Sequence, residues 1–441
     1  MFDGMNEISL ACGPDPSETN GGSLPPPRLR VPDRAQRTWE PCCLEERLAA
    51  DHPARTIWEI TGRLDLSAFY DVIDARGDAP GRAATDPRLL VALWLYAAVE
   101  GVGNGRALDR LCREHDGYRW LCGGVSMNYH TLNDFRVGHE TPLDDLLTQV
   151  LAVLMHQKVL MVRRISQDGM RIRASAGSSS FHQAGTLQRH LDEARVHVDA
   201  LKRQADDAPA DSAHQRAAQE RAARERQARL EAALAELPRI AEAKAAQKAK
   251  PSKDRPARAS STDPEARVMK MSNGGFNPAY NVQVAADPQS RAILGVAVVN
   301  AGSDSAQSEP MRRQVEARTG CKVEEHLIDG GFVTLAGMDR AAAQEVTVYA
   351  PPPAPKKAGS PHAVRPTDSP AVAAWRQRMA TDDAKTVYKL RAATSETINA
   401  DLRVFRGLHS FAVRGLTKVR CVAIWSVLAY NVWRFASDLL A

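Results

Sequence analysis

The spacing of apolar residues changes from helical to strand-like near residue 160. Over residues 41–158, apolar positions recur every three or four residues, and Asp86 followed by Pro87 suits an N-cap and a first helical turn. Over residues 165–174, apolar and charged residues alternate, which is the two-residue period of a strand. The pattern therefore predicts an α-helical N-terminal domain at 41–158 and a sheet-containing domain at 159–441.

Two segments are expected to interrupt the sheet-containing domain. Leu187 and Leu191 begin an apolar stripe with helical spacing, and a second stretch rich in Ala, Arg and Glu ends near Leu237. This pattern predicts a coiled, antiparallel helical hairpin followed by a basic linker, together at residues 183–261. Clustered prolines predict a loop at residues 351–370.

Strand and helix patterns continue after the basic linker. Runs of apolar and β-branched residues predict strands, and longer stretches of helix-forming residues predict helices. The expected strands cover residues 280–286, 292–299, 322–328 and 346–350, and the expected helices cover residues 305–318, 374–408 and 418–440. The fold class is therefore α/β, with an α-helical N-terminal domain and an inserted helical hairpin.

Composition narrows the class of protein without identifying it. The 441 residues allow two or more structural units, and 58 Lys and Arg against 53 Asp and Glu give a net charge of only +5. Residues 1–40, rich in Gly, Pro and Ser, predict a disordered tail and not a signal peptide. No apolar run reaches the roughly 20 residues of a membrane helix. Seven cysteines without metal-binding spacing indicate reduced thiols, so we expect a cytoplasmic protein.

Three carboxylates are candidates for a shared chemical site. Asp168 and Asp329 each end a strand-like segment and precede a glycine, although each is equally typical of an ordinary turn. Glu396 lies in the late helical region, with Arg403 seven positions on along the same predicted face. Carboxylates that converge repel each other unless cations neutralise them, and oxygen ligands favour Mg²⁺, with Mn²⁺ as a substitute.

Basic residues gather in two places that could contact nucleic acid. Residues 104–136 mix arginines with aromatic side chains, and residues 248–261 form a Lys- and Arg-rich linker. Both could grip a phosphate backbone. Solvated arginines over a helical core, and a solvated linker, explain the same patterns.

The motifs around the acids resemble those of the DDE transposases of bacterial insertion sequences, over nearly the whole chain after residue 40. The matching segments are 167–174 around Asp168, 328–332 around Asp329, and 262–267 followed by 280–284 between them. The resemblance implies an RNase H-like mixed sheet flanked by helices for the catalytic domain. The helical unit, including residues 131–136, resembles the domain that precedes catalysis in this family and is held to contribute to binding of the element's ends.

The resemblance also implies roles for individual residues. Asp168, Asp329 and Glu396 would be the catalytic and metal-binding acids, holding Mg²⁺ or Mn²⁺. The residues implied in DNA binding are Tyr388, Arg391, Arg403 and Arg414. This chain departs from the family signature in having four residues between Arg391 and Glu396, where related groups commonly have three, and in having Arg403 where lysine is usual.

The function implied is metal-dependent cleavage of DNA strands and their transfer at the ends of the protein's own insertion sequence. The expected partners are duplex DNA, as terminal inverted repeats and target, and a second copy of the chain in a dimer on DNA, with no membrane partner. Two alternatives share these residues. One is a DNA-binding or assembly protein that no longer cuts, and the other is an RNase H-like nuclease without strand transfer.

Overall fold

The computed structural model describes residues 43–76, 83–206, 213–246, 256–355 and 359–441. The chain divides into the units Met1–Cys43 and Leu44–Ala441, and the helices and strands of the described residues lie in the second unit. The tail predicted at residues 1–40 lies outside the described residues, as does part of the predicted basic linker.

The segment expected to be α-helical contains seven helices among its described residues. They are α1 (Pro53–Arg63), α2 (Ser67–Tyr70), α3 (Pro87–Val99), α4 (Gly105–Glu114), α5 (Asp116–Cys122), α6 (Tyr129–Gly138) and α7 (Glu140–His156). The start of α3 is confirmed, since the Asp86 side chain accepts a hydrogen bond from the backbone N–H of Arg88 and Pro87 occupies the first turn. Nearly every residue of α3 is buried, so this helix forms the centre of the N-terminal part.

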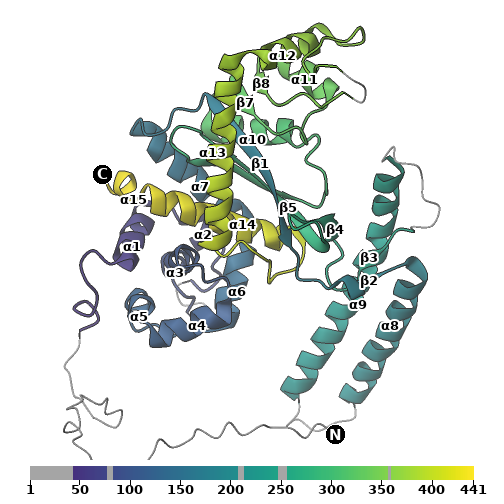
Figure 1. Cartoon of the computed structure of the whole chain (residues 1–441). Coiled ribbons are helices and arrows are strands. Elements are labelled where there is room, and N and C mark those ends of the chain that lie inside the picture. The colour runs from purple at the N-terminus through teal and green to yellow at the C-terminus, as the bar shows by residue number, and fades with distance from the viewer. Residues whose placement is uncertain (1–42, 77–82, 207–212, 247–255, 356–358) are drawn as a thin grey trace, which may run out of the picture. The chain divides into compact units, whose positions relative to one another are not determined.

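A six-stranded mixed sheet follows (Figure 1). Its strands are β1 (Arg164–Arg173), β4 (Arg267–Lys270), β5 (Phe276–Ala286), β6 (Ile293–Val299), β7 (Glu325–Leu327) and β8 (Thr347–Tyr349). The order is β4-β5-β1-β7-β8, with β6 also pairing with β5. β1, β4 and β6 run antiparallel to β5, whereas β1, β7 and β8 run parallel to one another.

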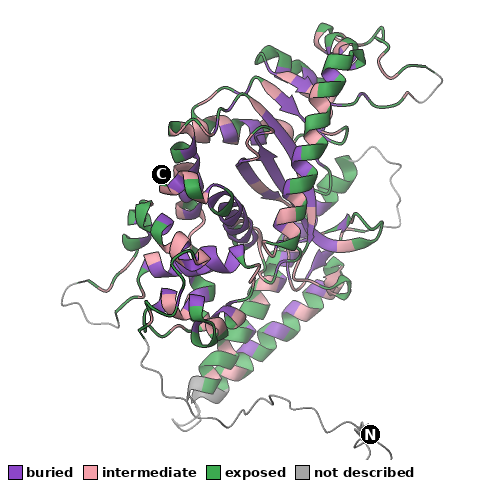
Figure 2. Ribbon diagram, turned by 60° about the vertical axis from the view of Figure 1, so that its left-hand side comes forward, coloured by how far each residue is buried: buried purple, intermediate pink, exposed green. Residues whose placement is uncertain are grey.

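The inserted hairpin consists of α8 (Ala184–Asp206) and α9 (Ala213–Ala246). Leu187, Leu191, Leu230 and Ala233 are buried between the two helices, so the predicted apolar stripes are confirmed. A small two-stranded sheet, β2 (Phe181–His182) with β3 (Ala259–Ser260), joins the chain where it enters and leaves the hairpin. Most other hairpin positions are exposed (Figure 2).

Helices complete the sheet-containing part. They are α10 (Ser308–Thr319), α11 (Leu335–Ala343), α12 (Pro370–Ala380), α13 (Asp382–Val404), α14 (Leu416–Arg434) and α15 (Ala436–Leu440). The single helix expected at residues 374–408 is instead two helices, because Thr381 leaves helical geometry and its side chain caps the first turn of α13. α13 packs against β1, which brings late residues to the start of the sheet.

The buried helix α14 joins the N-terminal helices to the sheet in one hydrophobic core. Trp425 on α14 donates a hydrogen bond to the carbonyl of Arg136 at 3.0 Å. Asn431 both donates to and accepts from the backbone of Ile293 on β6, at 2.8 and 2.9 Å. Among the described residues, no helix combines the length and apolar character that crossing a bilayer requires.

Candidate active site

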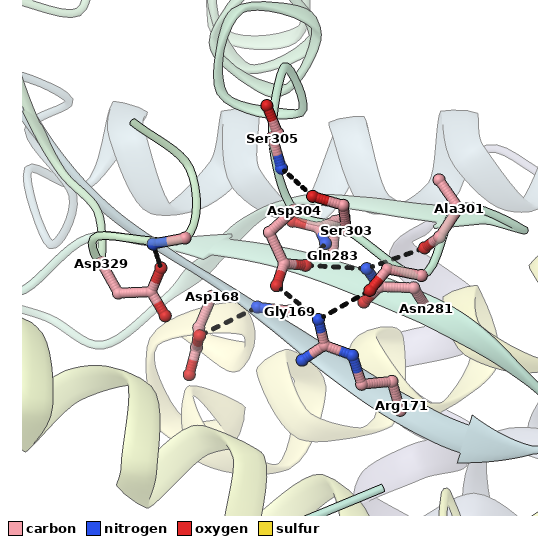
Figure 3. A network of polar contacts seen from close by, with 12 residues as sticks. Asp168, Gly169, Arg171, Asn281, Gln283, Ala301, Ser303, Asp304, Ser305 and Asp329 are labelled. Atoms are coloured by element: carbon pink, nitrogen blue, oxygen red, sulfur yellow. Dashed lines mark hydrogen bonds and ion pairs between the residues drawn. The ribbon is translucent and has the colours of Figure 1, made fainter. Parts of the chain in front are cut away.

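Alternate side chains of β1 point to opposite faces of the sheet and build two different polar clusters. Ser166 and Asp168 face α13, where the Ser166 hydroxyl lies 3.0 Å from the hydroxyl of Ser395. Gln167 and Gly169 face the opposite side, which is occupied by residues of β5 and the loop after β6. Figure 3 shows Asp168 and Asp329 together with the network around Asp304.

On the face of the sheet that packs against α13, Asp168 and Asp329 both contact the guanidinium group of Arg391. One guanidinium nitrogen of Arg391 lies 2.9 Å from Oδ1 of Asp168 and 3.5 Å from Oδ2 of Asp329. The parallel pairing of β1 with β7 causes this proximity, because Asp168 follows Ser166 by two residues and Asp329 follows the partner of Ser166, Leu327, by two residues. The two sequence-predicted aspartates therefore belong to one site.

Backbone and amide donors fix each carboxylate. Asp168 accepts from the N–H of Gly169 at 3.0 Å, and its second oxygen accepts from the side-chain amide of Asn399 on α13 at 2.9 Å. Asp329 accepts from the N–H of Gly331 at 2.7 Å. Each aspartate thus keeps a defined orientation, while the side chain of Asp329 is 38% exposed and that of Asp168 is 21% exposed.

The electrostatics of Asp168 reflect opposing effects. Burial raises the pKa of this carboxyl group, and the nearby charges of Asp329 and Asp304 act in the same direction. The Arg391 guanidinium and the Gly169 N–H lower the pKa, but they do not cancel the effect of burial. A further cation beside Asp168 would therefore stabilise its ionised form.

The opposite face of β1 holds a closed network around Asp304. The Asp304 carboxylate accepts hydrogen bonds from Asn281 and Gln283 at 2.7 Å each, and pairs with Arg171 at 2.8 Å (Figure 3). Asn281 and Gln283 share one face of β5, as their spacing predicts. The network presses on β1 at Gly169, where an added Cβ would lie 2.3 Å from an Asp304 oxygen. The glycine after Asp168 is thus required by close packing.

The other predicted site residues on α13 differ in how close they lie to the two aspartates. Burial raises the pKa of Tyr388, and the negative charges of Asp329 and Asp168 act in the same direction. Tyr388 therefore lies near the two aspartates. Glu396 is exposed on α13, and Arg403 is only partly exposed on the same helix. Within the part of the chain that the structure describes, no three acidic, His or Cys side chains are grouped closely enough to hold a metal ion. Glu396 therefore does not join the two aspartates in this arrangement.

Sequence reasoning missed Asn399, which donates a hydrogen bond from α13 to Asp168 at 2.9 Å. Arg391, Ser395 and Asn399 recur every four residues, and all three face β1. That spacing is visible in the sequence, but only packing against β1 distinguishes this side of the helix from the side with Glu396 and Arg403. Asp304 was also missed as a site neighbour, because only the folded chain brings its loop to β5.

The remaining predicted DNA contact, Arg414, lies in a different place. It lines a groove together with residues of α4, α6 and α9, in the segment that leads into α14. Arg414 is exposed there. The structure thus separates it from the carboxylates that Arg391 contacts.

The donors around Arg391 suit a hard divalent cation. Asp168 and Asp329 supply carboxylate oxygens, and the side-chain oxygen of Asn399 is buried without a hydrogen-bond partner among the described residues. Magnesium and manganese prefer such oxygen ligands. Two carboxylates and one amide oxygen are therefore donors of the kind that these cations prefer, although no three acidic, His or Cys side chains of the described residues are grouped around them.

Comparison with known proteins gives two family matches. Residues 42–137 match the family described as Transposase domain (DUF772), and residues 354–436 match the family described as Transposase DDE domain. The second match contains α13 with Arg391, Glu396 and Asn399. No curated protein and no solved structure matches the chain.

Proposed function

Because the chain belongs to the DDE transposases of insertion sequences, we propose that it cuts the DNA ends of its own element and joins them to a new site. The observation that carries this proposal is the pair Asp168 and Asp329, held by one guanidinium nitrogen of Arg391 beside α13. The mixed sheet flanked by helices supports the RNase H-like fold expected for such an enzyme. The reaction class is that of a polynucleotidyl transferase.

Asp168, Asp329 and Glu396 would hold Mg²⁺, or Mn²⁺ in its place. Bound there, the cations would supply positive charge at the scissile phosphate and lower the pKa of an attacking water or 3′-hydroxyl. The two aspartates are already oriented by backbone N–H groups, so little rearrangement is needed on their side. Asn399 would keep Asp168 in its present orientation through its amide donor.

Glu396 is the third acid of the proposal. It lies three residues before Asn399, so both belong to one turn of α13, and its long exposed side chain is free to turn toward Asp168. The cost of gathering a third carboxylate would be offset by the charge of the cations.

Arg391 has two roles in this proposal. Without DNA it neutralises the aspartates, which would otherwise repel each other. When cations neutralise the aspartates, its guanidinium becomes available to a DNA phosphate, for which a planar, multidentate donor is well suited. Tyr388 and Arg403, on the same helix, would contact DNA near the site, and a dimer on the paired element ends is the proposed assembly.

The test is cleavage of labelled DNA that carries the element's end, with Mg²⁺, by the wild type and by Asp168→Asn, Asp329→Asn and Glu396→Gln. We expect each substitution to reduce cutting by about a thousandfold or more while DNA binding is retained. Asn399→Ala serves as the matched variant on α13. It should retain measurable cutting, because an amide donor only positions Asp168.

The outcomes separate the alternatives. If the wild type binds DNA but never cuts it, the chain is a non-catalytic derivative of a transposase. If it cuts but gives no joined product from a 3′-hydroxyl substrate, it is a nuclease without strand transfer. If Glu396→Gln still cuts while both aspartate variants do not, the third acid is a different residue.

A further inference from the structure

A large groove lies away from the aspartates, between three parts of the chain that are distant in sequence. It has a volume of about 1040 Å³ and is bordered by α4 and α6, by α9 of the inserted hairpin, and by the segment leading into α14. Basic side chains from all three parts line it: Arg106, Arg136, Arg229, Arg414 and Lys418. No function described above uses this groove as a whole.

Arg414 lies close enough to Arg229 to affect the pKa of Arg229. Burial and the positive charge of Arg414 lower the pKa of Arg229, although the charge of Glu225 opposes this effect. Like charges held together cost free energy unless an anion neutralises them. Arg106, Arg414 and Lys418 form no ion pair with any residue that the structure describes. The basic side of the groove is therefore only partly neutralised by the protein.

Two acids in the groove are already committed to the fold. Asp263 accepts hydrogen bonds from the Tyr280 hydroxyl at 2.7 Å and from the N–H of Gly415 at 3.2 Å. Glu265 accepts from the N–H of Leu416 at 2.7 Å. Both carboxylates thus fix the backbone at the start of α14, and burial raises the pKa of Asp263.

The other acids neutralise the groove incompletely. Glu236 is buried and pairs with Arg267. Glu225 lies 3.8 Å from Arg229, but its side chain is 64% exposed, and such surface pairs contribute little. Asp134 is exposed at the edge of the groove.

The remaining lining leaves room for an extended, charged ligand. Ala228, Ala232 and Ala235 present small side chains along one side of α9, which lets a ligand's backbone approach the helix closely. The guanidinium of Arg106 lies 5.0 Å from the ring centre of Tyr129 across the groove's far side, which holds this arginine in place.

We propose that this groove binds the phosphate backbone of duplex DNA, with Arg229 of the hairpin and Arg414 as its central contacts. The inserted hairpin would then act as one side of a DNA-binding groove, which deepens the DNA binding proposed above and rests on it. The groove is at the upper limit of small-molecule pockets, roughly 300 to 1,000 Å³, so a polymer fits it better than a metabolite. Arginines that reach a phosphate backbone bind it without reading its sequence.

The experiment measures binding of the full chain to two labelled duplexes, the element's end and a random sequence, over a range of salt concentrations. We expect Arg229→Ala with Arg414→Ala to weaken binding to both duplexes, by about tenfold for each arginine at low salt. The slope of log affinity against log salt should become shallower by about one for each phosphate contact that is lost.

The matched control is Arg189→Ala with Arg195→Ala, which removes two exposed arginines of α8 that pair with Glu193 and Glu231. It should leave affinity and salt slope unchanged. The charge-conserving change of Arg229 and Arg414 to lysine should restore most of the salt slope, which a loss of folding would not allow.

Equal affinity and salt slope in the wild type and the double alanine variant would overturn the assignment of the groove. A loss for the element's end alone would also overturn it, because backbone contacts act on every sequence. Asp168→Asn separates this inference from the proposed function. If that variant still cuts DNA, the proposed chemistry fails, whereas the binding result for the groove is unaffected.

Discussion

The two sides of β1 carry carboxylates in contrasting surroundings. On one side, the side chain of Asp304 is 8% exposed and has an arginine and two side-chain amides as donors. On the other side, Asp168 and Asp329 are more exposed and share one cation, Arg391. The carboxylates on the two sides of β1 therefore differ in burial and in the donors that surround them.

This contrast separates a structural cluster from a reactive one. A buried carboxylate whose oxygens are all matched by donors stabilises its surroundings and has no capacity left for a ligand. Asp168 and Asp329 also accept hydrogen bonds from backbone or amide donors, but they are more exposed than Asp304 and share Arg391 as their ion-pair partner. The following substitutions should therefore affect stability on the Asp304 side and activity on the Asp168 side.

The largest loss of stability is expected from Asp304→Leu. It removes the acceptor of the buried Gln283 amide and the charged partner of Arg171, and leaves the Asn281 amide only its longer hydrogen bond to the Ala301 carbonyl, at a cost of about 2 to 5 kcal/mol. Urea denaturation measures the loss. Asp199→Leu, at an exposed position of α8, is the control and should change stability by less than about 0.5 kcal/mol.

Gly169→Ala should be the next most damaging change. The new Cβ would lie 2.3 Å from an Asp304 oxygen and 2.6 Å from the Gln283 nitrogen, so β1 or the network must shift, at a cost of about 1 to 3 kcal/mol. Because Asp168 is the adjacent residue, cleavage should fall as well. Gly185→Ala, which meets no atom within 4 Å, should not destabilise the fold. Equal melting temperatures for the two variants would contradict the close packing at Gly169.

The buried His326 on β7 should make stability depend on pH. Burial, with a smaller contribution from Arg312, lowers its pKa to about 3, so the folded chain excludes a proton that the unfolded chain binds below about pH 6.5. Stability from this residue is therefore complete above that pH and is lost as the pH falls toward 3. Between pH 7 and pH 5 the loss should be about 2 kcal/mol.

The measurement is urea denaturation at both pH values. His326→Leu should lose less stability on acidification than the wild type. His130→Leu changes an exposed histidine and should behave as the wild type does. An unchanged pH dependence in His326→Leu would show that another group is responsible.

The smallest effect on stability is expected at the reactive side. Burial raises the pKa of Asp168, so ionising this carboxyl group costs more free energy in the folded chain than in the unfolded chain. Asp168→Asn should therefore keep the melting temperature or raise it slightly, by no more than about 1 kcal/mol in stability, while it abolishes cutting. A loss as large as that of Asp304→Leu would remove the contrast between the two sides of β1.

Local patterns predicted much of this fold. The cap at Asp86, the alternation in β1 and the hairpin of β5 and β6 follow from short-range spacing, and the structure confirms each of them. The pairing of Asp168 with Asp329 was foreseen from strand ends and family resemblance. The break at Thr381 could also have been foreseen, since a threonine followed by two aspartates is typical of a helix start.

The face of α13 could not be predicted from local spacing alone. Glu396 and Arg403 are seven residues apart and share one face, while Arg391 and Asn399 share another. Both sets are compatible with a helix, and only packing against β1 selects between them. In the structure, the side of α13 with Arg391 and Asn399 faces β1. Glu396 is exposed on another side of the helix.

The position of α14 has a consequence for the order in which the chain can fold during synthesis. Every strand of the sheet and all seven N-terminal helices leave the ribosome before α14, which carries the Trp425 and Asn431 contacts that join them. Until that helix emerges, the apolar surfaces of the N-terminal helices and of the sheet that α14 covers stay exposed to water or to chaperones. The nascent chain therefore cannot complete its active form before translation has passed Asn431.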